Sequence, residues 1–169
     1  SKLNMKYPAT ILKGDYAHAR CISIAVAHKD VIQDAGAKMI HLGKNTRSQI
    51  ISKSIAHSGG NATYRGVVRI EKSATNSYAE VTCDTLILDR LSKSDTIPTE
   101  IIKNKSSFLK HEAKVTDLDK EKMFYLNARN INKAQARHLL VLGFVEPFVE
   151  ELPMEYAVEL NRLLRIDLE

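Results

Sequence analysis

The feature that most constrains this chain is a change of period near Thr116. From about Lys38 to Val115, short β-branched runs that alternate apolar and polar residues are separated by segments rich in Gly, Asn, Ser and Asp. After Thr116 the apolar residues follow helical spacing instead. The sequence therefore predicts a mainly β body over residues 1–115 and a small helical domain over residues 116–169.

The spacing of the β runs is compatible with a sandwich, a barrel or a β-solenoid. Turn segments such as GKNTR and SATN lack the Asn-Gly or Asp-Gly pair of two-residue hairpins, which favours successive coils. The first 30 residues already read as strands without a cap. Because solenoids need capped ends, we expect the β body to be truncated at its N-terminal side.

Three amphipathic helices are predicted after Thr116. The first ends near Asn130, and the second has Asn132 as its N-cap and a kink or restart at Pro147. The third carries Pro153 in its first turn and places four apolar side chains on one face, namely Tyr156, Leu160, Leu163 and Leu164. These helices either pack on the β body or dock in a partner's groove, and Phe144, Phe148 and Tyr156 are the candidate anchors.

Composition narrows the functional class. The net charge of +5 resides in the first 100 residues. The basic residues there are not interleaved with aromatic residues, as they are in proteins that bind single-stranded nucleic acid, which argues against a nucleic-acid ligand. Binding of an acidic polymer is a lesser alternative. No apolar run approaches the roughly 20 residues of a membrane span, and no signal peptide opens the chain. Two cysteines cannot build a disulfide framework. We expect a cytoplasmic protein with no membrane partner.

The segment FLKHEAKV, residues 108–115, places two potential metal ligands side by side. Successive strand residues point to opposite faces, so His111 belongs to the apolar face and Glu112 to the polar face. From the residues alone, the favoured interpretation is that His111 is a hydrogen-bonded core histidine and that Glu112 is a solvated glutamate. The competing interpretation is a metal site completed by another strand or another subunit.

Cys83 poses a similar choice. It lies within an apolar strand, AEVTCDTLIL, where a buried thiol is usually a small hydrophobe. Alternatively, its thiolate binds iron or an iron–sulfur cluster. No local residue decides between these roles, and the sequence contains neither a phosphate loop nor a readable Ser/His/Asp arrangement, so an autonomous hydrolase is not expected.

Several segments taken together resemble the carboxy-terminal core of the SufB/SufD family, scaffold proteins of the SUF iron–sulfur cluster assembly system. They are DAGAKMIHLGKNTRSQIISKSIAHSGGNATYRGVVRI, CDTLILD, SKSDTIP, HEAKV and GFVEPFVEELPMEYAVELNRLL, in that order. The resemblance implies a right-handed parallel β-helix followed by a helical domain. It also implies a complex with the ATPase SufC on the terminal helices, pairing with a second SufB/SufD-type subunit, and sulfur delivered by a cysteine desulfurase system.

The resemblance also assigns roles to single residues. Cys83 matches the SufB-type cysteine implicated in cluster assembly, Glu112 matches a SufB-type glutamate, and His111 matches a histidine contributed by the SufD-type subunit. The implied cofactor is a transient iron–sulfur cluster at the subunit interface, with iron bound by Cys83, His111 and Glu112 from two chains. The chain itself is expected to be no enzyme, because ATPase activity resides in SufC. A SufD-like structural subunit supporting a SufB paralogue is the alternative.

Overall fold

The computed structural model describes residues 1–118 and 120–168, with side-chain detail as far as residue 165. The chain forms two compact units, Ser1–Val115 and a second unit that begins at Thr116.

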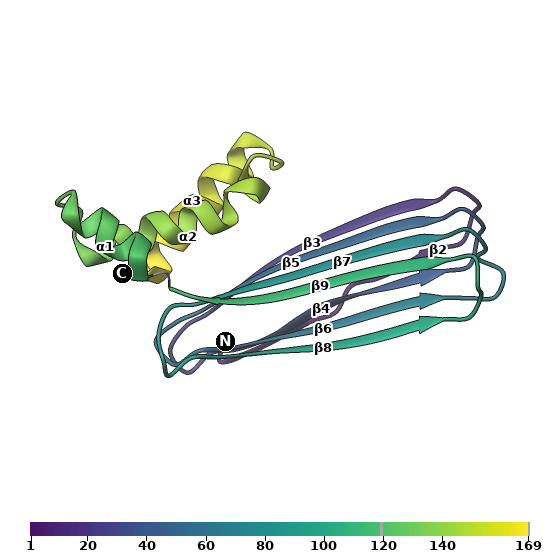
Figure 1. Ribbon diagram of the computed structural model, residues 1–169, viewed down its shortest axis with the longest axis horizontal. Helices are drawn as coiled ribbons and strands as arrows, with labels where there is room; N and C mark the ends of the chain where they lie inside the picture. The colour runs from purple at the N-terminus through teal and green to yellow at the C-terminus, as the bar shows by residue number, and fades with distance from the viewer. Residues whose placement is uncertain (119, 169) are drawn as a thin grey trace. The chain divides into compact units, whose positions relative to one another are not determined.

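The first unit is a parallel β-solenoid of about four turns, as the sequence resemblance predicted. Every pair of neighbouring strands with a determined register is parallel. The strands form two sheets, one in the order β3-β5-β7-β9 and one in the order β1-β4-β6-β8 with β2 also on β4 (Figure 1). The strands are β1 (Leu3–Lys6), β2 (Ala9–Leu12), β3 (His18–Ala27), β4 (Ile32–His41), β5 (Arg47–Ala56), β6 (Asn61–Ile70), β7 (Tyr78–Ile87), β8 (Lys93–Ile102) and β9 (Phe108–Asp117).

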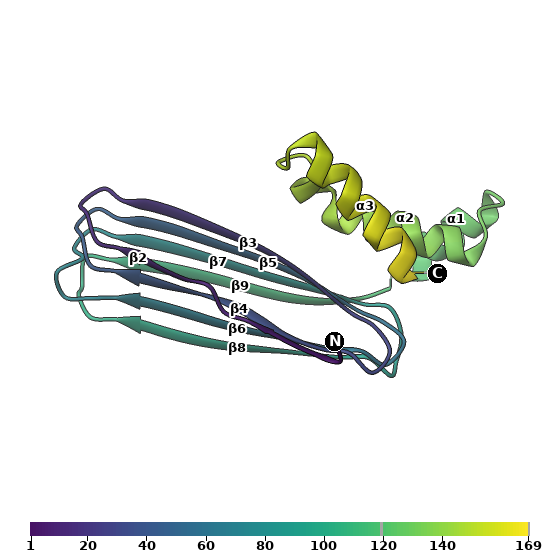
Figure 2. The same cartoon turned by 180° about the vertical axis from the view of Figure 1, so that it is seen from behind.

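Stacking in register explains why hairpin turns are missing from the sequence. Ile32 pairs with Asn61, and Arg47 pairs with Tyr78, so each residue meets a residue about 30 positions further along the chain. From β2 onward, consecutive strands therefore belong to opposite sheets, and the chain advances by one coil for every two strands. Figure 2 shows the first strands, β1 and β2, alongside β4 at the start of the stack.

Alternation along the strands fills the space between the sheets. In β7 the side chains of Ala79, Val81, Cys83 and Thr85 are buried, while the residues between them are partly exposed. The main apolar cluster combines residues of both sheets: Leu12, Ala37, Met39, Ile50, Tyr64, Val68, Ile70, Ala74, Ala79, Val81 and Cys83. Strand parity thus decides which candidate ligands face the interior.

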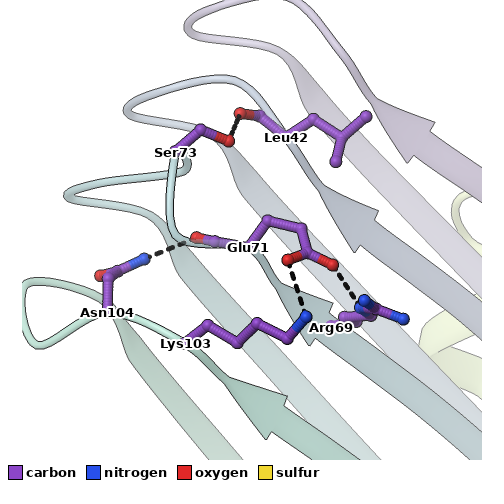
Figure 3. Close-up of polar contacts among 6 residues, drawn as sticks. All are labelled: Leu42, Arg69, Glu71, Ser73, Lys103 and Asn104. Carbon is purple, nitrogen blue, oxygen red and sulfur yellow. Dashed lines mark hydrogen bonds and ion pairs between the residues drawn. The ribbon is translucent and has the colours of Figure 1, made fainter.

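Hydrogen bonds between successive corners lock the coils together. Thr46 Oγ1 and Ser77 Oγ are 2.8 Å apart, and the amide of Ser77 donates to Ser107 Oγ at 3.0 Å, which links three coils at one corner. In the neighbouring turns, Glu71 forms ion pairs with Arg69 and with Lys103, the latter at 3.0 Å (Figure 3). The corners are therefore polar stacks that hold the register of the sheets.

Hydrogen bonds from side chains to backbone carbonyls form a second set of contacts between successive coils (Figure 3). Asn104 Nδ2 donates to the carbonyl of Glu71 at 2.9 Å, and Ser73 Oγ donates to the carbonyl of Leu42 at 2.8 Å. Asn45 and Asn76 occupy equivalent turns with φ of 55° and 57°. Asparagine tolerates this left-handed conformation better than most residues, which explains its place at the corners.

The second unit contains three helices: α1 (Lys120–Ala128), α2 (Lys133–Val149) and α3 (Met154–Leu168). Asn132 caps α2 as predicted, and it forms a capping box with Gln135. The helix continues through Pro147 and ends two residues later. Pro153 directly precedes α3. Among the helices of the described residues, none is long and apolar enough to cross a bilayer.

Burial on α3 differs from the predicted apolar face. Leu164 is buried and Leu160 is partly buried, whereas Tyr156 and Leu163 are exposed. The buried stripe therefore follows Leu160 and Leu164, one helical turn apart, and it is narrower than the face predicted from the sequence.

Candidate functional site

Cys83 lies in the interior of the solenoid near its last coil. The side chain is 4 % exposed and belongs to the main apolar cluster. Burial raises the pKa of the thiol to about 12, the neighbouring Tyr64 hydroxyl partly offsets this, and the charges of Asp84 and Glu100 add to it. The thiol is therefore protonated at neutral pH, and a bound metal would have to displace its proton.

Tyr64 faces the same interior from the opposite sheet. Its strand β6 also contains Gly66, where a Cβ atom would stand only 2.5 Å from the Tyr64 hydroxyl oxygen. The missing side chain at position 66 therefore makes room for the ring. Burial raises the pKa of Tyr64, and the nearby Cys83 raises it further. The buried hydroxyl nevertheless has no hydrogen bond of standard geometry within the described part of the chain.

His111 points inward from β9, as strand alternation predicted. Its side chain is 14 % exposed, and Nδ1 lies 2.6 Å from Oε1 of Glu100. The other ring nitrogen, Nε2, is buried and has no hydrogen-bond partner among the described residues. Glu100 lies on β8 and pairs in register with the buried Val68 on the neighbouring strand β6. Register partners in a parallel sheet point to the same face, so the side chain of Glu100 also belongs to the inner face.

We call four inner-face residues of the last two coils the interior cluster: Tyr64, Cys83, His111 and Glu100, whose side chain is 33 % exposed. Two sheets contribute to it, with Tyr64 and Glu100 from one and Cys83 and His111 from the other. The charge of Glu100 adds to the raised pKa of both Cys83 and Tyr64, after the larger effect of burial. Thiol, imidazole and carboxylate are all groups that bind iron.

Glu112 is absent from this cluster because it faces outward. Its side chain is 64 % exposed, and one carboxylate oxygen is 3.9 Å from Nζ of Lys110. Lys110 also pairs with Glu80 at 3.4 Å on the same outer face. His111 and Glu112 therefore diverge from one strand, and no group of three or more His, Cys, Asp or Glu side chains within the described ranges is arranged to hold a metal ion.

Cys21 and His41 are the other interior groups of chemical interest. Cys21 packs against the main apolar cluster, and burial raises the pKa of its thiol. His41 is fully buried between Thr46 Oγ1 and Ser48 Oγ, each 2.8 Å from a ring nitrogen. Both ring nitrogens are therefore occupied, and this histidine is part of the corner structure.

The three aromatic residues proposed for partner docking lie in different environments. Phe148 is 4 % exposed, Phe144 is partly buried and Tyr156 is 68 % exposed. A buried ring cannot reach a partner unless the unit opens, so Phe148 belongs to the core of the helical unit. Two hollows lie between α2 and α3, of about 380 and 430 Å³, and share Leu142 and Asn161 among their lining residues.

Sequence reasoning missed Glu100 and Tyr64. Alternation in DTIPTEII places Thr96, Pro98 and Glu100 on one face, but only the pairing of β8 with β6 shows that this face is the inner one. Tyr64 shares its face with Ala62, Gly66 and Val68, a pattern that signals burial. Their meeting with Cys83 depends on the two sheets facing one another, which no local pattern encodes.

Comparison with known proteins gives one consistent result. The family profile described as SUF system FeS cluster assembly, SufBD core domain, matches residues 1–144. The chain is 53 % identical over all its 169 residues to the iron–sulfur cluster assembly protein SufB of Bacillus subtilis. It is 50 % identical to iron–sulfur cluster assembly SufBD family proteins of Staphylococcus saprophyticus and Staphylococcus epidermidis. In each case the chain spans 36 % of the relative's length.

Proposed function

The chain belongs to the SufB/SufD family of the SUF iron–sulfur cluster assembly system, and on that premise we propose that it is a scaffold subunit on which nascent clusters are built. One observation supports this role above the others. Cys83 and His111 share the interior of the last coils, and Nε2 of His111 is buried there without a partner among the described residues. Iron and sulfide are the substrates in this proposal, and the cluster is the product.

A second SufB/SufD-type subunit completes the site in this proposal. β8 and β9 are the last strands of their sheets. An edge strand offers unpaired backbone groups to another chain. The edge also carries exposed apolar side chains: Ile97, Ile101, Ile102, Phe108 and Val115. Glu112 faces outward and His111 faces inward, so one chain alone does not direct both side chains at one ion. Pairing at this edge would let each of them bind iron together with ligands from the other subunit.

Sulfur delivery and energy input come from partners in this proposal. A cysteine desulfurase system supplies sulfur, and SufC supplies ATPase activity, so this chain is a cytoplasmic assembly subunit and not an enzyme. We place SufC on the helical unit. Exposed apolar side chains on its helices support a docking role: Phe124, Tyr125, Met154, Tyr156 and Val158. The hollow lined by Leu139, Leu142 and Gly143 offers a groove for a partner segment.

A SufD-like structural subunit is the second candidate, and one observation favours it. The raised pKa of Cys83 shows a thiol that is poorly reactive in the isolated chain. In this alternative the chain contributes its edge strands and its helices, while a paralogue assembles the cluster.

Anaerobic reconstitution of the whole chain with ferrous iron and sulfide separates the two candidates. If the scaffold role is correct, Cys83→Ala abolishes the visible cluster absorbance and cluster transfer to an apo-acceptor, because the interior loses its thiolate. Cys21→Ala is the matched control, since it removes a partly buried thiol from the same interior. Equal cluster formation by wild type and the Cys83→Ala, Glu112→Ala double variant would refute the assignment of these residues.

A further inference from the structure

We propose that Glu100 is a positioning residue that holds the imidazole of His111 in one tautomer, with Nε2 presented to the solenoid interior as a ligand atom for iron. The inference rests on the proposed function for the identity of the metal. The tautomer itself is a property of this chain and can be tested without a cluster.

The contact between the two side chains carries the first step. Nδ1 of His111 and Oε1 of Glu100 are 2.6 Å apart, a short hydrogen bond between a ring nitrogen and a carboxylate. An ionised carboxylate only accepts hydrogen bonds, so Nδ1 must carry the proton. In the neutral imidazole the lone pair then lies on Nε2.

The surroundings of Nε2 carry the second step. This atom is buried and lacks a hydrogen-bond partner among the described residues, although buried polar atoms are nearly always paired. Cys83 lies on β7, the strand next to β9 in the same sheet, and its side chain is 4 % exposed. The unpaired lone pair thus belongs to the same interior cluster as the candidate thiolate.

The chemistry of metal-bound histidine explains what this arrangement achieves. Histidine ligands commonly donate their second ring N–H to a carboxylate, which fixes the tautomer, orients the ring and makes the ligand nitrogen more basic. Loss of such a partner costs about 10- to 100-fold in metal affinity. Glu100 is suited to this role because it lies on β8 and His111 lies on β9, in facing sheets. The paired backbones of the two sheets fix the positions from which the two side chains meet.

Nitrogen NMR of the whole chain with ¹⁵N-labelled histidine tests the tautomer directly. At a pH of about 8 we expect a proton on Nδ1 of His111, where Glu100 accepts it, and none on the unpaired Nε2. His111→Gln identifies its signals among those of the six histidines. Glu100→Val should move most of the population to the Nε2–H form that free histidine prefers, whereas Glu100→Asp should retain the Nδ1–H form.

The matched control is Asp95→Asn on the same strand. Asp95 is an exposed carboxylate, so its loss changes the net charge equally without touching the interior. Unchanged signals from the other histidines and an unchanged circular dichroism spectrum establish that the variants fold. An Nε2–H tautomer or a doubly protonated ring in the wild type would overturn the inference, and so would an unchanged tautomer in Glu100→Val.

Titration with Co²⁺ in place of Fe²⁺ tests the ligand role. Glu100→Val should weaken binding by about 10- to 100-fold relative to Asp95→Asn, whereas equal affinities would show that the carboxylate does not support a metal ligand. The two proposals fail separately. Loss of cluster formation in Cys83→Ala with a tautomer indifferent to Glu100 would leave the scaffold role intact, whereas cluster formation in the absence of Cys83 and Glu112 would refute the site regardless of the tautomer.

Discussion

His41 shows how burial fixes the protonation state of a single side chain in the solenoid. The residue is fully buried, and hydroxyl groups of Thr46 and Ser48 lie 2.8 Å from its two ring nitrogens. Burial lowers its pKa from 6.5 to about 4. The folded state therefore holds a neutral imidazole at pH values where the unfolded chain already binds a proton.

This difference predicts acid sensitivity of the β unit. Because the folded-state pKa is depressed, the contribution of His41 to stability is fully present above pH 6.5 and is lost as the pH falls from 6.5 to about 4. A shift of this size corresponds to about 3 kcal/mol at most. We expect the free energy of unfolding, measured by urea and circular dichroism, to fall less between a pH of about 8 and about 5 in His41→Gln than in wild type.

His18→Gln is the control for this prediction. His18 is exposed at the start of β3, so His18→Gln removes an imidazole without disturbing the buried corner around His41. If the free energy of unfolding fell equally with pH in wild type and His41→Gln, another titratable group would dominate the acid response.

At the scale of the element, α2 and α3 contain both core and surface aromatic residues. Phe148 is buried with Val141, Val145 and Ala136 on α2, while Tyr156 on α3 is exposed. Partner anchors are usually aromatic side chains that become buried only on binding. The exposed ring is therefore the better candidate for contact with SufC, and the buried ring is the better candidate for the core.

Paired substitutions separate these roles. Phe148→Ala should destabilise the helical unit by about 3–5 kcal/mol, because it leaves a cavity in a packed interior. Tyr156→Asp should keep the helical circular dichroism signal and weaken recovery of SufC in a pull-down. Normal SufC recovery by folded Tyr156→Asp would remove this residue from the docking surface, and a folded, fully stable Phe148→Ala would contradict its place in the core.

At the scale of the whole β unit, a solenoid differs from a closed barrel because its last coil leaves two strand edges that pair with no further strand of the described residues. β9 and β8 occupy this position here. Natural proteins protect such edges with charges or cover them with a partner. The exposed apolar residues along β8 and β9 favour a covered edge over a solvated one.

This arrangement predicts that the edge at the last coil mediates subunit pairing. Val115→Lys places a charge on β9 and should weaken dimerisation by about tenfold, equal to about 1.4 kcal/mol, as measured by sedimentation equilibrium. Ile11→Lys on β2 is a matched control, because the two side chains are 57 % and 58 % exposed but lie at opposite ends of the stack. Weaker dimerisation in Ile11→Lys alone would place the interface at the first coils.

Much of the architecture was predictable from local patterns. The period of two before Thr116 and the helical period after it correspond to strands and helices in the structure, and the cap at Asn132 is confirmed. Parity alone predicted that His111 and Glu112 would diverge, because side chains alternate in any strand whatever sheet it joins. Strand spacing left a solenoid, a sandwich and a barrel open, the turn composition favoured successive coils, and the family resemblance made the choice.

The sequence by itself determined the secondary structure, the inward side of β9 and the burial of Cys83, because period and apolar neighbours are local properties. The roles of Cys83, His111 and Glu112 in cluster assembly stay a prediction. Only the tertiary structure brought Glu100 to His111 and Tyr64 toward Cys83, and only it buried Phe148 while exposing Tyr156. The physical reason is that these contacts join facing sheets or packed helices. In the solenoid their geometry depends on pairing between residues about 30 positions apart, which no short sequence motif specifies.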